Sequence, residues 1–509
     1  KAALLGYVAN KVMDDSGSNP ERNPGRLPCP EYSSCQSASG SCTPPPSVND
    51  GVAAAACPPP AVGRLPWRTL GLDKLTDASG QPLWYVVSPG WALQSTGSTL
   101  QINFNTSGQL SVDNQSNAAV GLIVAPGPPI QMPASTTGNC PARTQSGAVS
   151  PPDYRDYLEC PNAASPVGVD GFATTGVAGA FNDQVVQVTA ADVMRVIEGP
   201  IAQRIQAQIV PAINNVYFTD TATGKYWGNA RPLYPFAAPF NNPTPERDLL
   251  LPPPPNDGSI DNYEGVLPLA PDASSEVGWL TSGSFFPSCA IGGGANCGLS
   301  VMPSSTTISY SVVGVGSPPP TLTIWAYASA VGTGFRQPPG ILANVSDPGY
   351  TSRSIENTLR PDGKAMVVYQ GTPPLGNSTV TLTINAADDP ITDWSNATTG
   401  WFIRNQWYKF TYYAVSGRYT PGGNQTCTGG PASRPCLTIN VDGVPNNNIH
   451  ALLVFAGRFL TGVNAPGRPS GQLASYFENA NKTPPNNWVF ETHSAVTSSF
   501  NDRAFAIAP

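Results

Sequence analysis

The stretch YLECPN, Tyr157 to Asn162, returns near the end of the chain as YFENAN, Tyr476 to Asn481. Each copy precedes a second shared motif, FND, at Phe181 to Asp183 and at Phe500 to Asp502. The separation from the glutamate to the phenylalanine is 22 positions in both copies, from 159 to 181 and from 478 to 500. Six matching residues at constant spacing predict that the chain contains two copies of one structural unit.

The repeated polar residues have two interpretations. Two carboxylates, one acid and one base, could flank the bond that a glycosidase cleaves. Each glutamate, however, occupies the same position of its own unit, which favours a role in the fold: a carboxylate that accepts loop backbone N–H groups, with the asparagine stabilising the turn. We therefore assign structural roles to the six repeated residues, Glu159, Asn162, Asp183, Glu478, Asn481 and Asp502.

The composition is typical of an extracellular protein with several domains. A chain of 509 residues is too long for one hydrophobic core, and roughly two to four domains are expected. Only 12% of the residues are charged, so Ser, Thr, Asn and Gln must cover much of the surface. The 56 prolines and 50 glycines predict many turns and long ordered loops.

The charge pattern excludes nucleic-acid binding, because the net charge is -7 and no cluster of Lys and Arg is present. No apolar run approaches the roughly 18 residues of a membrane span, and no signal peptide is present. The opening AALLGYVANKV places Leu4, Leu5, Val8 and Val12 on one helix face without a capping residue. We therefore expect helical residues before Lys1, and membrane contact only through that segment.

Ten cysteines favour disulfides formed in an oxidising compartment. Zinc is disfavoured because the chain has no CxxC pair and only two histidines, His450 and His493. Local spacing predicts three bonds: Cys140 with Cys160, Cys289 with Cys297, and Cys427 with Cys436. The pairing among the remaining four stays open; these are Cys29, Cys35, Cys42 and Cys57.

Apolar and alternating runs bounded by Gly and Pro predict four strands in the first unit. They are PLWYVVS (82–88), TLQINFN (99–105), AAVGLIVAPG (118–127) and FNDQVVQVT (181–189). A second helix is predicted from about Asp192 to Asn214 by its stripe of Val and Ile, with Pro200 and Pro211 expected to kink or segment it.

After this helix the motifs of the first unit return in their original order. ARPLYPFAAPF (230–240) resembles GRLPCP (25–30), EVGWL (276–280) resembles AVGRLPW (61–67), and FTYYAVSG (410–417) resembles LWYVVSPG (83–90). CLTINVDG (436–443) matches TLQINFNTSG (99–108), and HALLVFAG (450–457) matches VGLIVAPG (120–127). About a hundred residues between Cys297 and Trp401 have no counterpart in the first unit.

The additional residues predict a separate β domain. Four alternating strands are separated by Pro/Gly turns: TTISYSVVGV (306–315), PTLTIWAYAS (320–329), KAMVVYQG (364–371) and NSTVTLTINA (377–386). The predicted fold class is α+β and β-rich, with two helix-plus-antiparallel-sheet units and an inserted β-sandwich-like domain. The predicted domains are 1–189, then 190–297 with 399–509, and the insertion 298–398.

The order of these motifs resembles a known family. A helix ending in ALLGYVAN, followed by GRLPCP, GRLPW, LWYVVS, an apolar strand running into APG, YLE and FND, is similar to the soluble domains of large type IV pilin-like proteins. These are the minor pilins and pseudopilins of bacterial pili and type II secretion. The resemblance covers Ala2 to Thr189 best, the second unit more loosely and the insertion not at all.

The resemblance implies a long N-terminal helix packed on an antiparallel sheet, and an oxidised domain assembled with other pilin subunits in a cell-surface filament. A non-enzymatic structural or adhesive subunit, of the minor or tip type, is the expected function, with a surface glycan or protein as receptor. The alternatives are a secreted carbohydrate-binding or carbohydrate-active protein on a pilin-like scaffold, and a pseudopilin of a type II secretion system. A filament subunit of this kind is exported and needs no cofactor.

Motifs for catalysis and metal binding are scarce. The chain has no GxSxG, HExxH or phosphate-binding glycine loop, and structural roles are favoured for both histidines. In ADDPITDW, Asp388, Asp389 and Asp393 could supply oxygen ligands to Ca²⁺. A solvated turn is favoured over calcium there, because the spacing is not that of an EF-hand.

Overall fold

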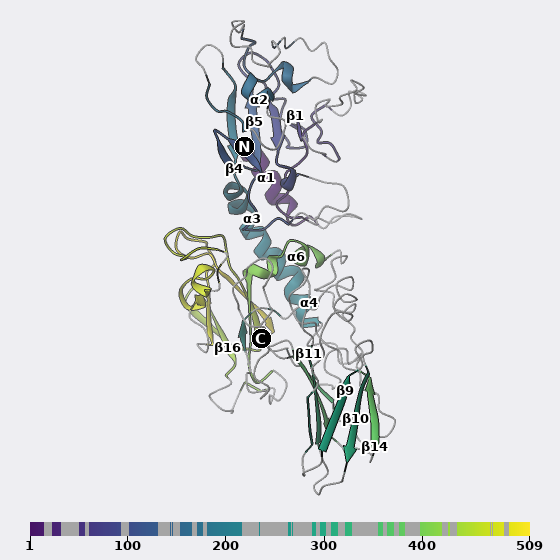
Figure 1. Cartoon of the computed structure of the whole chain (residues 1–509). Helices are drawn as coiled ribbons and strands as arrows, with labels where there is room; N and C mark the ends of the chain where they lie inside the picture. Colours follow the sequence, from purple (N-terminus) through teal and green to yellow (C-terminus); the bar gives the residue numbers. More distant parts are fainter. Residues whose placement is uncertain are drawn as a thin grey trace. The chain divides into compact units, whose positions relative to one another are not determined.

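The computed structural model divides the chain into two compact units, Lys1–Ile201 and Ala202–Pro509, and each is described by itself (Figure 1). The structure describes residues 1–14, 23–31, 50–55, 57, 61–92, 101–130, 143, 145, 153–164, 171–176, 181–215, 234, 263–265, 267, 288–291, 296–301, 307–313, 321–327, 355–359, 364–370, 376–381, 398–419, 426–427, 435–468, 470, 472–482 and 488–508. The whole is a mixed α+β protein in which sheets predominate.

The first unit is built on a four-stranded antiparallel sheet of order β1-β2-β5-β6. Its strands are β1 (Val62–Arg64), β2 (Trp84–Val87), β5 (Gly121–Ala125) and β6 (Gln184–Val188). All four residues of β2 are buried, as expected of a central strand covered on both faces. The strands expected at 82–88, 118–127 and 181–189 are therefore present.

The two faces of the sheet have different coverings. Trp84 and Val86 belong to a core with Leu110, Tyr157 and Phe172 on one face. On the other face lies helix α1 (Ala2–Lys11), which buries Leu4 and Val8. Burial, with Tyr7 of α1 nearby, raises the pKa of Tyr85, the residue between Trp84 and Val86. Because side chains alternate along β2, Trp84 and Val86 contact the loop side of the sheet, and Tyr85 lies on the side of α1.

Smaller elements complete the first unit. The hairpin of β3 (Leu110–Val112) and β4 (Gln115–Ala119) turns at two residues with positive φ, Asp113 and Asn114. Such a turn matches the twist of a two-residue hairpin. The remaining elements are the 3₁₀ turns η2 (Pro89–Trp91) and η4 (Tyr154–Asp156) and the short helix α2 (Cys160–Ala164).

The strand expected at TLQINFN is wrong for its described part, residues 101–105. The Asn103 side chain accepts the N–H of Asn105 at 2.9 Å, and Thr106 Oγ1 donates to the Gln101 carbonyl at 2.8 Å. These local bonds satisfy the backbone within a turn and compete with strand pairing.

The predicted second helix extends across the boundary between the compact units. It consists of α3 (Ala190–Arg204), a π-helical turn η5 (Ile205–Ile209) and α4 (Val210–Asn214). Pro200 lies inside α3, and Pro211 stands at the start of α4, where its missing N–H is tolerated. Among the described residues, no helix is long and apolar enough to cross a membrane.

The second unit repeats the sheet order of the first. Its four-stranded antiparallel sheet has the order β20-β18-β15-β7, from β7 (Glu264–Gly265), β15 (Thr411–Val415), β18 (Ala451–Phe455) and β20 (Arg503–Ala508). A second sheet of order β17-β16-β19 contains β16 (Leu437–Val441), β17 (Val444–Ile449) and β19 (Val489–Thr492). The short elements are α6 (Gly400–Arg404), η7 (Trp407–Phe410), η8 (Leu473–Ser475) and η9 (Asn479–Lys482).

Backbone hydrogen bonds identify equivalent strands in the two units. Val87 N–H donates to Ala61 at 3.0 Å, and Val415 N–H donates to Tyr263 at 2.8 Å. Strand β7 therefore occupies the place of β1, a role that the sequence comparison had given to EVGWL (276–280). That segment lies outside the described residues, and the structural counterpart of β1 is β7 with Tyr263 before it.

The hairpin comparison also needs a correction. In the first unit Asp113 N–H donates to Phe172 at 2.8 Å, and in the second Asp442 N–H donates to Thr492 at 3.1 Å. The counterpart of β16 is thus β3, eleven residues beyond the start of the TLQINFN segment that was matched to it. Both hairpins turn at an aspartate with positive φ, Asp113 and Asp442.

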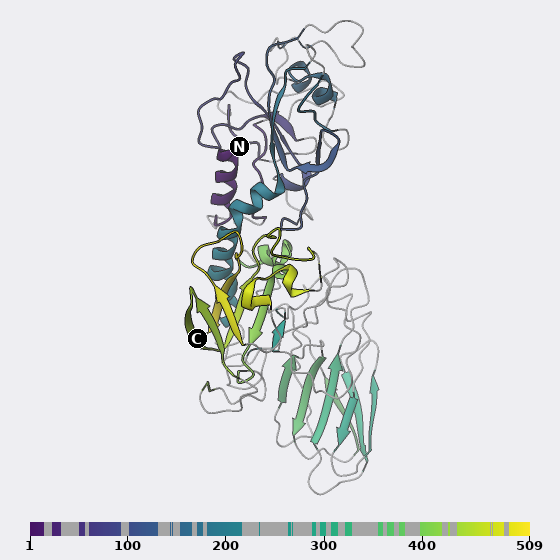
Figure 2. The same ribbon diagram turned by 90° about the vertical axis from the view of Figure 1, so that its left-hand side faces the viewer.

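The inserted region forms two antiparallel sheets (Figure 2). One has the order β14-β10-β9, from β9 (Asn296–Val301), β10 (Thr307–Val313) and β14 (Gly376–Thr381). The other has the order β12-β13-β11-β8, from β8 (Ser288–Ile291), β11 (Thr321–Tyr327), β12 (Ile355–Leu359) and β13 (Lys364–Gln370). All four strands expected there are present, and the sheets also include residues 288–291 and 296–297, before the predicted start of the insertion at 298.

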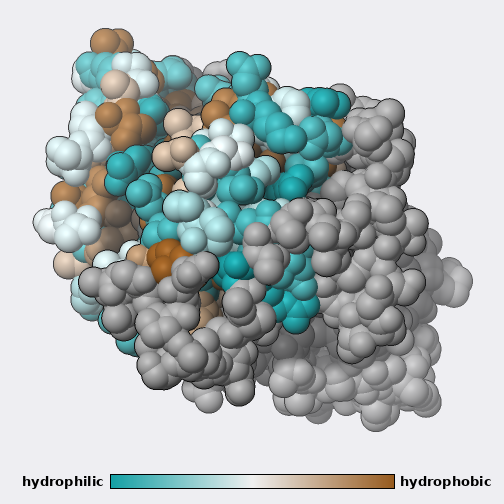
Figure 3. Space-filling view, turned by 90° about the horizontal axis from the view of Figure 1, so that it is seen from above, coloured by the Kyte–Doolittle hydropathy of each residue, from teal (hydrophilic) through white to brown (hydrophobic). Residues whose placement is uncertain are grey.

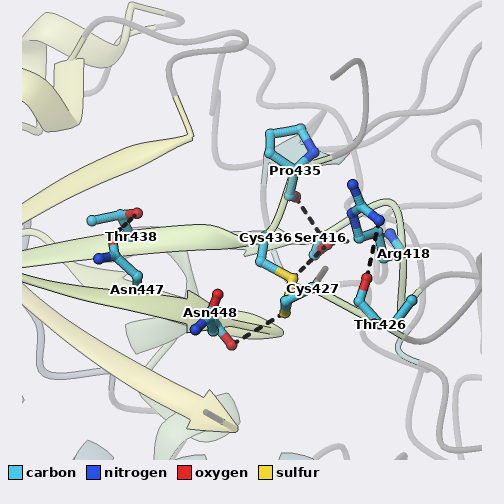
Figure 4. The surroundings of a disulfide bond; sticks show 9 residues. All are labelled: Ser416, Arg418, Thr426, Cys427, Pro435, Cys436, Thr438, Asn447 and Asn448. Carbon is cyan, nitrogen blue, oxygen red and sulfur yellow. Dashed lines mark hydrogen bonds between the residues drawn. A yellow bond between two sulfur atoms is a disulfide. The ribbon is translucent and has the colours of Figure 1, made fainter. Parts of the chain in front are cut away.

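Two disulfides are described, and no described cysteine is free. Cys29 bonds to Cys57, which settles one pair among the four N-terminal cysteines. The predicted Cys427–Cys436 bond is present, and it lies beside Ser416 at the end of β15 (Figure 4). Cys160 is also disulfide-bonded. Its predicted partner Cys140 and the cysteines at 35 and 42 lie outside the described residues, and for Cys289 and Cys297 only the strand backbone is described.

We expect the two described disulfides to contribute unequally to stability. Cross-linking removes more entropy from the unfolded chain when it closes a longer loop. The resulting stabilisation is about 3.6 kcal/mol for Cys29–Cys57, which are 28 residues apart, and about 2.6 kcal/mol for Cys427–Cys436, which are 9 apart. Urea unfolding of C29S/C57S and C427S/C436S should therefore show the larger loss for the N-terminal pair. The reverse order would mean that native contacts of the bonds outweigh loop entropy.

Candidate functional site

The repeated residues of the first unit form one buried cluster. Asp183 Oδ2 accepts the N–H of Glu159 and the side-chain amide of Asn162, both at 2.8 Å. Asn162 also pairs with the backbone of Ala173, accepting its N–H at 2.7 Å and donating to its carbonyl at 3.3 Å. The three side chains thereby connect α2, the loop around Ala173 and the start of β6.

The second unit contains the same hydrogen bonds. Asp502 Oδ2 accepts the N–H of Glu478 at 2.8 Å and the side-chain amide of Asn481 at 3.0 Å. Asn481 accepts the N–H of Glu491 at 2.8 Å and donates to its carbonyl at 2.9 Å. We call the two sets, Glu159–Asn162–Asp183 and Glu478–Asn481–Asp502, the first and second carboxylate clusters.

The asparagine of each FND motif has an equivalent bond. Asn182 donates its side-chain amide to the Pro128 carbonyl at 2.8 Å, and Asn501 donates to the Arg458 carbonyl, also at 2.8 Å. Both acceptors lie in the loop that follows the adjacent strand, β5 or β18. The Asn–Asp pair before each final strand therefore holds two loops against the sheet.

Both clusters lie beside an arginine that the sequence comparison missed. Arg143 donates to the carbonyls of Pro126 and Pro128 at 3.1 Å and also to that of Tyr157. Arg468 donates to the carbonyls of Gly457 at 2.6 Å, Ser475 at 2.8 Å and Tyr476 at 2.8 Å. Each guanidinium satisfies carbonyls of the loop after the adjacent strand and of the segment leading to the glutamate.

A sequence signal for these arginines does exist. Arg143 ends NCPAR (139–143) and Arg468 ends NAPGR (464–468), so both follow the pattern Asn-x-Pro-x-Arg. The pattern lies 16 residues before Glu159 but only 10 before Glu478. Because the intervening loops differ in length, a search at constant spacing does not find it.

The two clusters differ in how the glutamate is held. In the first, Arg143 donates to Glu159 Oε1 and lies 3.7 Å from Asp183 Oδ1. In the second, the Asn464 side chain donates to Glu478 Oε1 at 2.8 Å, and the Asn501 N–H donates to Oε2 at 3.1 Å. The first cluster thus contains a cation, and the second is closed by neutral donors.

Burial dominates the electrostatics of both clusters. Desolvation raises the pKa of Glu159 to about 7 against the attraction of Arg143, and that of Asp183 to about 6. Burial, followed by the repulsion of Glu478, raises the pKa of Asp502 well above its usual range. A carboxyl group removed from water favours its neutral form unless a partner fully compensates its charge.

The geometry restricts what these carboxyl groups can do chemically. The side chains of Glu159 and Glu478 are 0% exposed, so neither can approach a glycosidic bond or any other substrate. Each is bonded within its own unit, to backbone and side chains that connect loops with the final strand. The arrangement therefore performs a structural task, which is to fix the loop before each cluster to the last strand of its sheet.

The other candidate residues lie apart from the clusters. Asp388, Asp389 and Asp393, the calcium candidates, lie outside the described residues. His450 is half-buried against Tyr419, with 3.6 Å between the ring centres, and burial lowers its pKa to about 4. His493 lies between Asp442 at 3.1 Å and Glu491 at 2.7 Å. No group of three or more His, Cys, Asp or Glu side chains suited to a metal occurs in the part of the chain that the structure describes.

Replacement of Arg143 tests whether its charge matters. We expect Arg143→Met to destabilise the first unit by about 3–5 kcal/mol, because buried Glu159 loses its cationic partner and must take up a proton, and three carbonyls lose their donor. Adding Glu159→Gln should recover part of the loss, because glutamine is neutral without that proton. Urea unfolding, followed by hydrogen exchange of peptides from residues 154–164, measures the free energy of unfolding of this unit.

The matched control is in the second unit. Arg468→Met should also destabilise, since three carbonyls lose their donor, but Glu478→Gln should bring no recovery because Arg468 donates to carbonyls and not to Glu478. Equal recovery in both units, or none in the first, would contradict a specific charge pairing of Arg143 with Glu159.

Comparison with known proteins finds no relative, so the only structural comparison for each unit is the other unit of the same chain. No protein-family model matches the chain, and neither the curated proteins nor the solved structures contain a significant match to it. Within the chain, the cluster bonds, the FND bonds and the sheet orders agree between the units.

Proposed function

We propose that this protein is a non-enzymatic structural or adhesive subunit of an extracellular filament of the type IV pilus kind, built from two pilin-like units. The observation that carries the proposal is the repeated unit itself. Each copy has a four-stranded antiparallel sheet whose final strand is fixed by a buried carboxylate cluster. Helices accompany both sheets, α1 in the first unit and α4 in the second.

The disulfide bonds that cross-link the loops support an exported location. Disulfides close loops at Cys29–Cys57 and Cys427–Cys436, and Cys160 is bonded as well. Such bonds persist in oxidising compartments and are rare in the cytosol. Hydrogen bonds from Arg143 and Arg468 also satisfy loop carbonyls in each unit. Loops cross-linked and hydrogen-bonded in this way suit a subunit exposed outside the cell.

The polar character of the surface agrees with this proposal. In the space-filling view, polar residues occupy much of the coloured surface, with apolar residues between them (Figure 3). A largely neutral, hydrogen-bonding surface favours contact with other subunits and with glycans over contact with strongly charged polymers. Within this proposal the clusters make each unit a rigid building block.

The inserted sheets add a surface that the repeated unit lacks. Their strands between Ser288 and Thr381 have no counterpart among the described residues of the first unit. We assign to them the contact with a surface glycan or protein receptor, since removing them would leave both repeated units intact. A duplicated, bulky subunit of this kind fits an accessory or tip position better than the shaft of a filament.

Isolation of surface filaments from cells that make the natural protein tests this function. We expect the protein in the sheared filament fraction, with its cysteines oxidised and a methylated N-terminus in mass spectrometry. A variant lacking residues 288–381 should still enter filaments but lose attachment to host or matrix surfaces. Protein found only free in the medium, with the deletion changing sugar binding or hydrolysis, would favour the secreted carbohydrate-active alternative.

A further inference from the structure

The charge balance of the second carboxylate cluster is incomplete. The first cluster pairs two carboxyl groups with the guanidinium of Arg143. In the second, neither Glu478 nor Asp502 forms an ion pair with a lysine or arginine among the described residues. Both side chains are 0% exposed, so water cannot compensate them. Two adjacent buried carboxylates without a cation cannot both stay ionised at neutral pH.

The hydrogen bonds indicate which carboxyl group carries the proton. Both oxygens of Glu478 accept from neutral donors, Asn464 and the backbone of Asn501, as a carboxylate does. Asp502 Oδ2 likewise accepts two bonds, and the Glu478 side chain lies close enough to share a proton with Asp502. Asp502 Oδ1 is buried and accepts no bond from a described donor. A proton on this oxygen leaves one ionised and one neutral carboxyl group in the cluster.

We propose that the second cluster holds one proton on the Glu478–Asp502 pair, and that loss of this proton above neutral pH releases the final strand β20 from residues 473–482. The carboxyl group of Asp502 immediately precedes β20 and accepts from the Glu478 backbone, so its charge acts on the bond that joins the strand to this segment. Strand β20 is at the edge of its sheet, and among the described strands it pairs with β18 alone. Its separation would leave β7, β15 and β18 paired with one another.

The surrounding charged groups do not supply the missing cation. Arg468 donates to three carbonyls, His493 lies between Asp442 and Glu491, and the Arg458 carbonyl accepts from Asn501. Lys482 is in η9, and Arg503 follows Asp502 in β20. The charged and titratable residues on the elements next to the pair are thus Arg458, Arg468, Lys482, Glu491, His493 and Arg503.

The direction of the pH effect follows from the raised pKa of Asp502. The folded unit holds the proton over a pH range in which the unfolded chain has released it. The resulting stability is complete below the ordinary pKa of an aspartate and is lost as pH rises through the folded value. In the first cluster the same effect ends near pH 7, because the pKa of Glu159 is about 7 and that of Asp183 about 6.

Hydrogen exchange of the full chain between pH 6 and pH 9, corrected for intrinsic exchange rates, tests this proposal. Peptides from residues 473–482 and 501–508 report on the second cluster, and peptides from 154–164 and 181–188 on the first. Above pH 7 we expect the opening equilibrium constant of the second set to keep rising, by at most about tenfold per pH unit and until the folded pair loses its proton, and that of the first to stay constant. Equal slopes in both sets would overturn the proposal.

Two matched variants identify the group that titrates. Asp502→Asn supplies a permanent N–H where the proton is placed, so the pH dependence of peptides 473–482 and 501–508 should disappear above pH 7. Asp183→Asn instead brings an amide toward Arg143 and should weaken the first unit at every pH. If Asp502→Asn keeps the wild-type slope, another group is responsible. The wild-type slopes alone decide the proposal even if a variant does not fold.

Discussion

One hydrogen bond organises each unit: the aspartate just before the last strand accepts the backbone N–H of a glutamate in a distant loop. Buried backbone N–H and C=O groups must form hydrogen bonds, and a long loop cannot satisfy its own N–H and C=O groups as a helix or sheet does. The aspartate supplies an acceptor at a point already fixed by the sheet. The asparagine three residues after the glutamate uses the same oxygen and extends the connection to a third segment.

The need for further donors follows from this constraint. A loop that packs against the sheet also buries carbonyl groups, and these need hydrogen-bond donors. Arg143 and Arg468 each donate hydrogen bonds to several such carbonyls. A guanidinium has five N–H donors in a rigid fork, so one residue can satisfy carbonyls from two loops. The choice of arginine thus reflects the number of carbonyls to be satisfied as much as the charge to be balanced.

Sequence patterns predict those parts of the fold in which local and long-range preferences agree. The runs of β2 and β5 are apolar and mostly buried, Gly or Pro lies next to each, and they form strands as expected. Strand β6 also forms as expected, although it contains two glutamines and only its last residue, Val188, is fully buried. TLQINFN alternates in the same way, but the asparagine and threonine side chains bond to the nearby backbone and form a turn. Strand β7 has only two residues and one of them is charged, so its pairing with β15 leaves almost no local pattern.

The candidate site was only partly predictable, for a different reason. Glu159, Asn162 and Asp183 keep a constant spacing because the segments between them have equal length in both units. The arginines lie across a loop of variable length, and spacing therefore carries no information about them. What they contact, and hence the charge of each cluster, is decided by side-chain geometry alone.

Differences between the copies show that the structural task can be met in more than one way. Where the first unit places Gln109, whose side chain accepts from Ser88 and Gly90, the second has Cys436, bonded to Cys427 beside Ser416. Arg143 at Glu159 is likewise replaced by Asn464 at Glu478.

Each exchange preserves a connection and changes its chemistry. A hydrogen-bonded amide gives way to a covalent bond that depends on oxidation, and an ion pair gives way to neutral donors that leave one carboxyl group dependent on a proton. Because the loops and strands joined are the same, the two units keep one architecture. At these two positions the second unit depends on oxidation of Cys436 and on a proton at Asp502, where the first unit uses the amide of Gln109 and the guanidinium of Arg143.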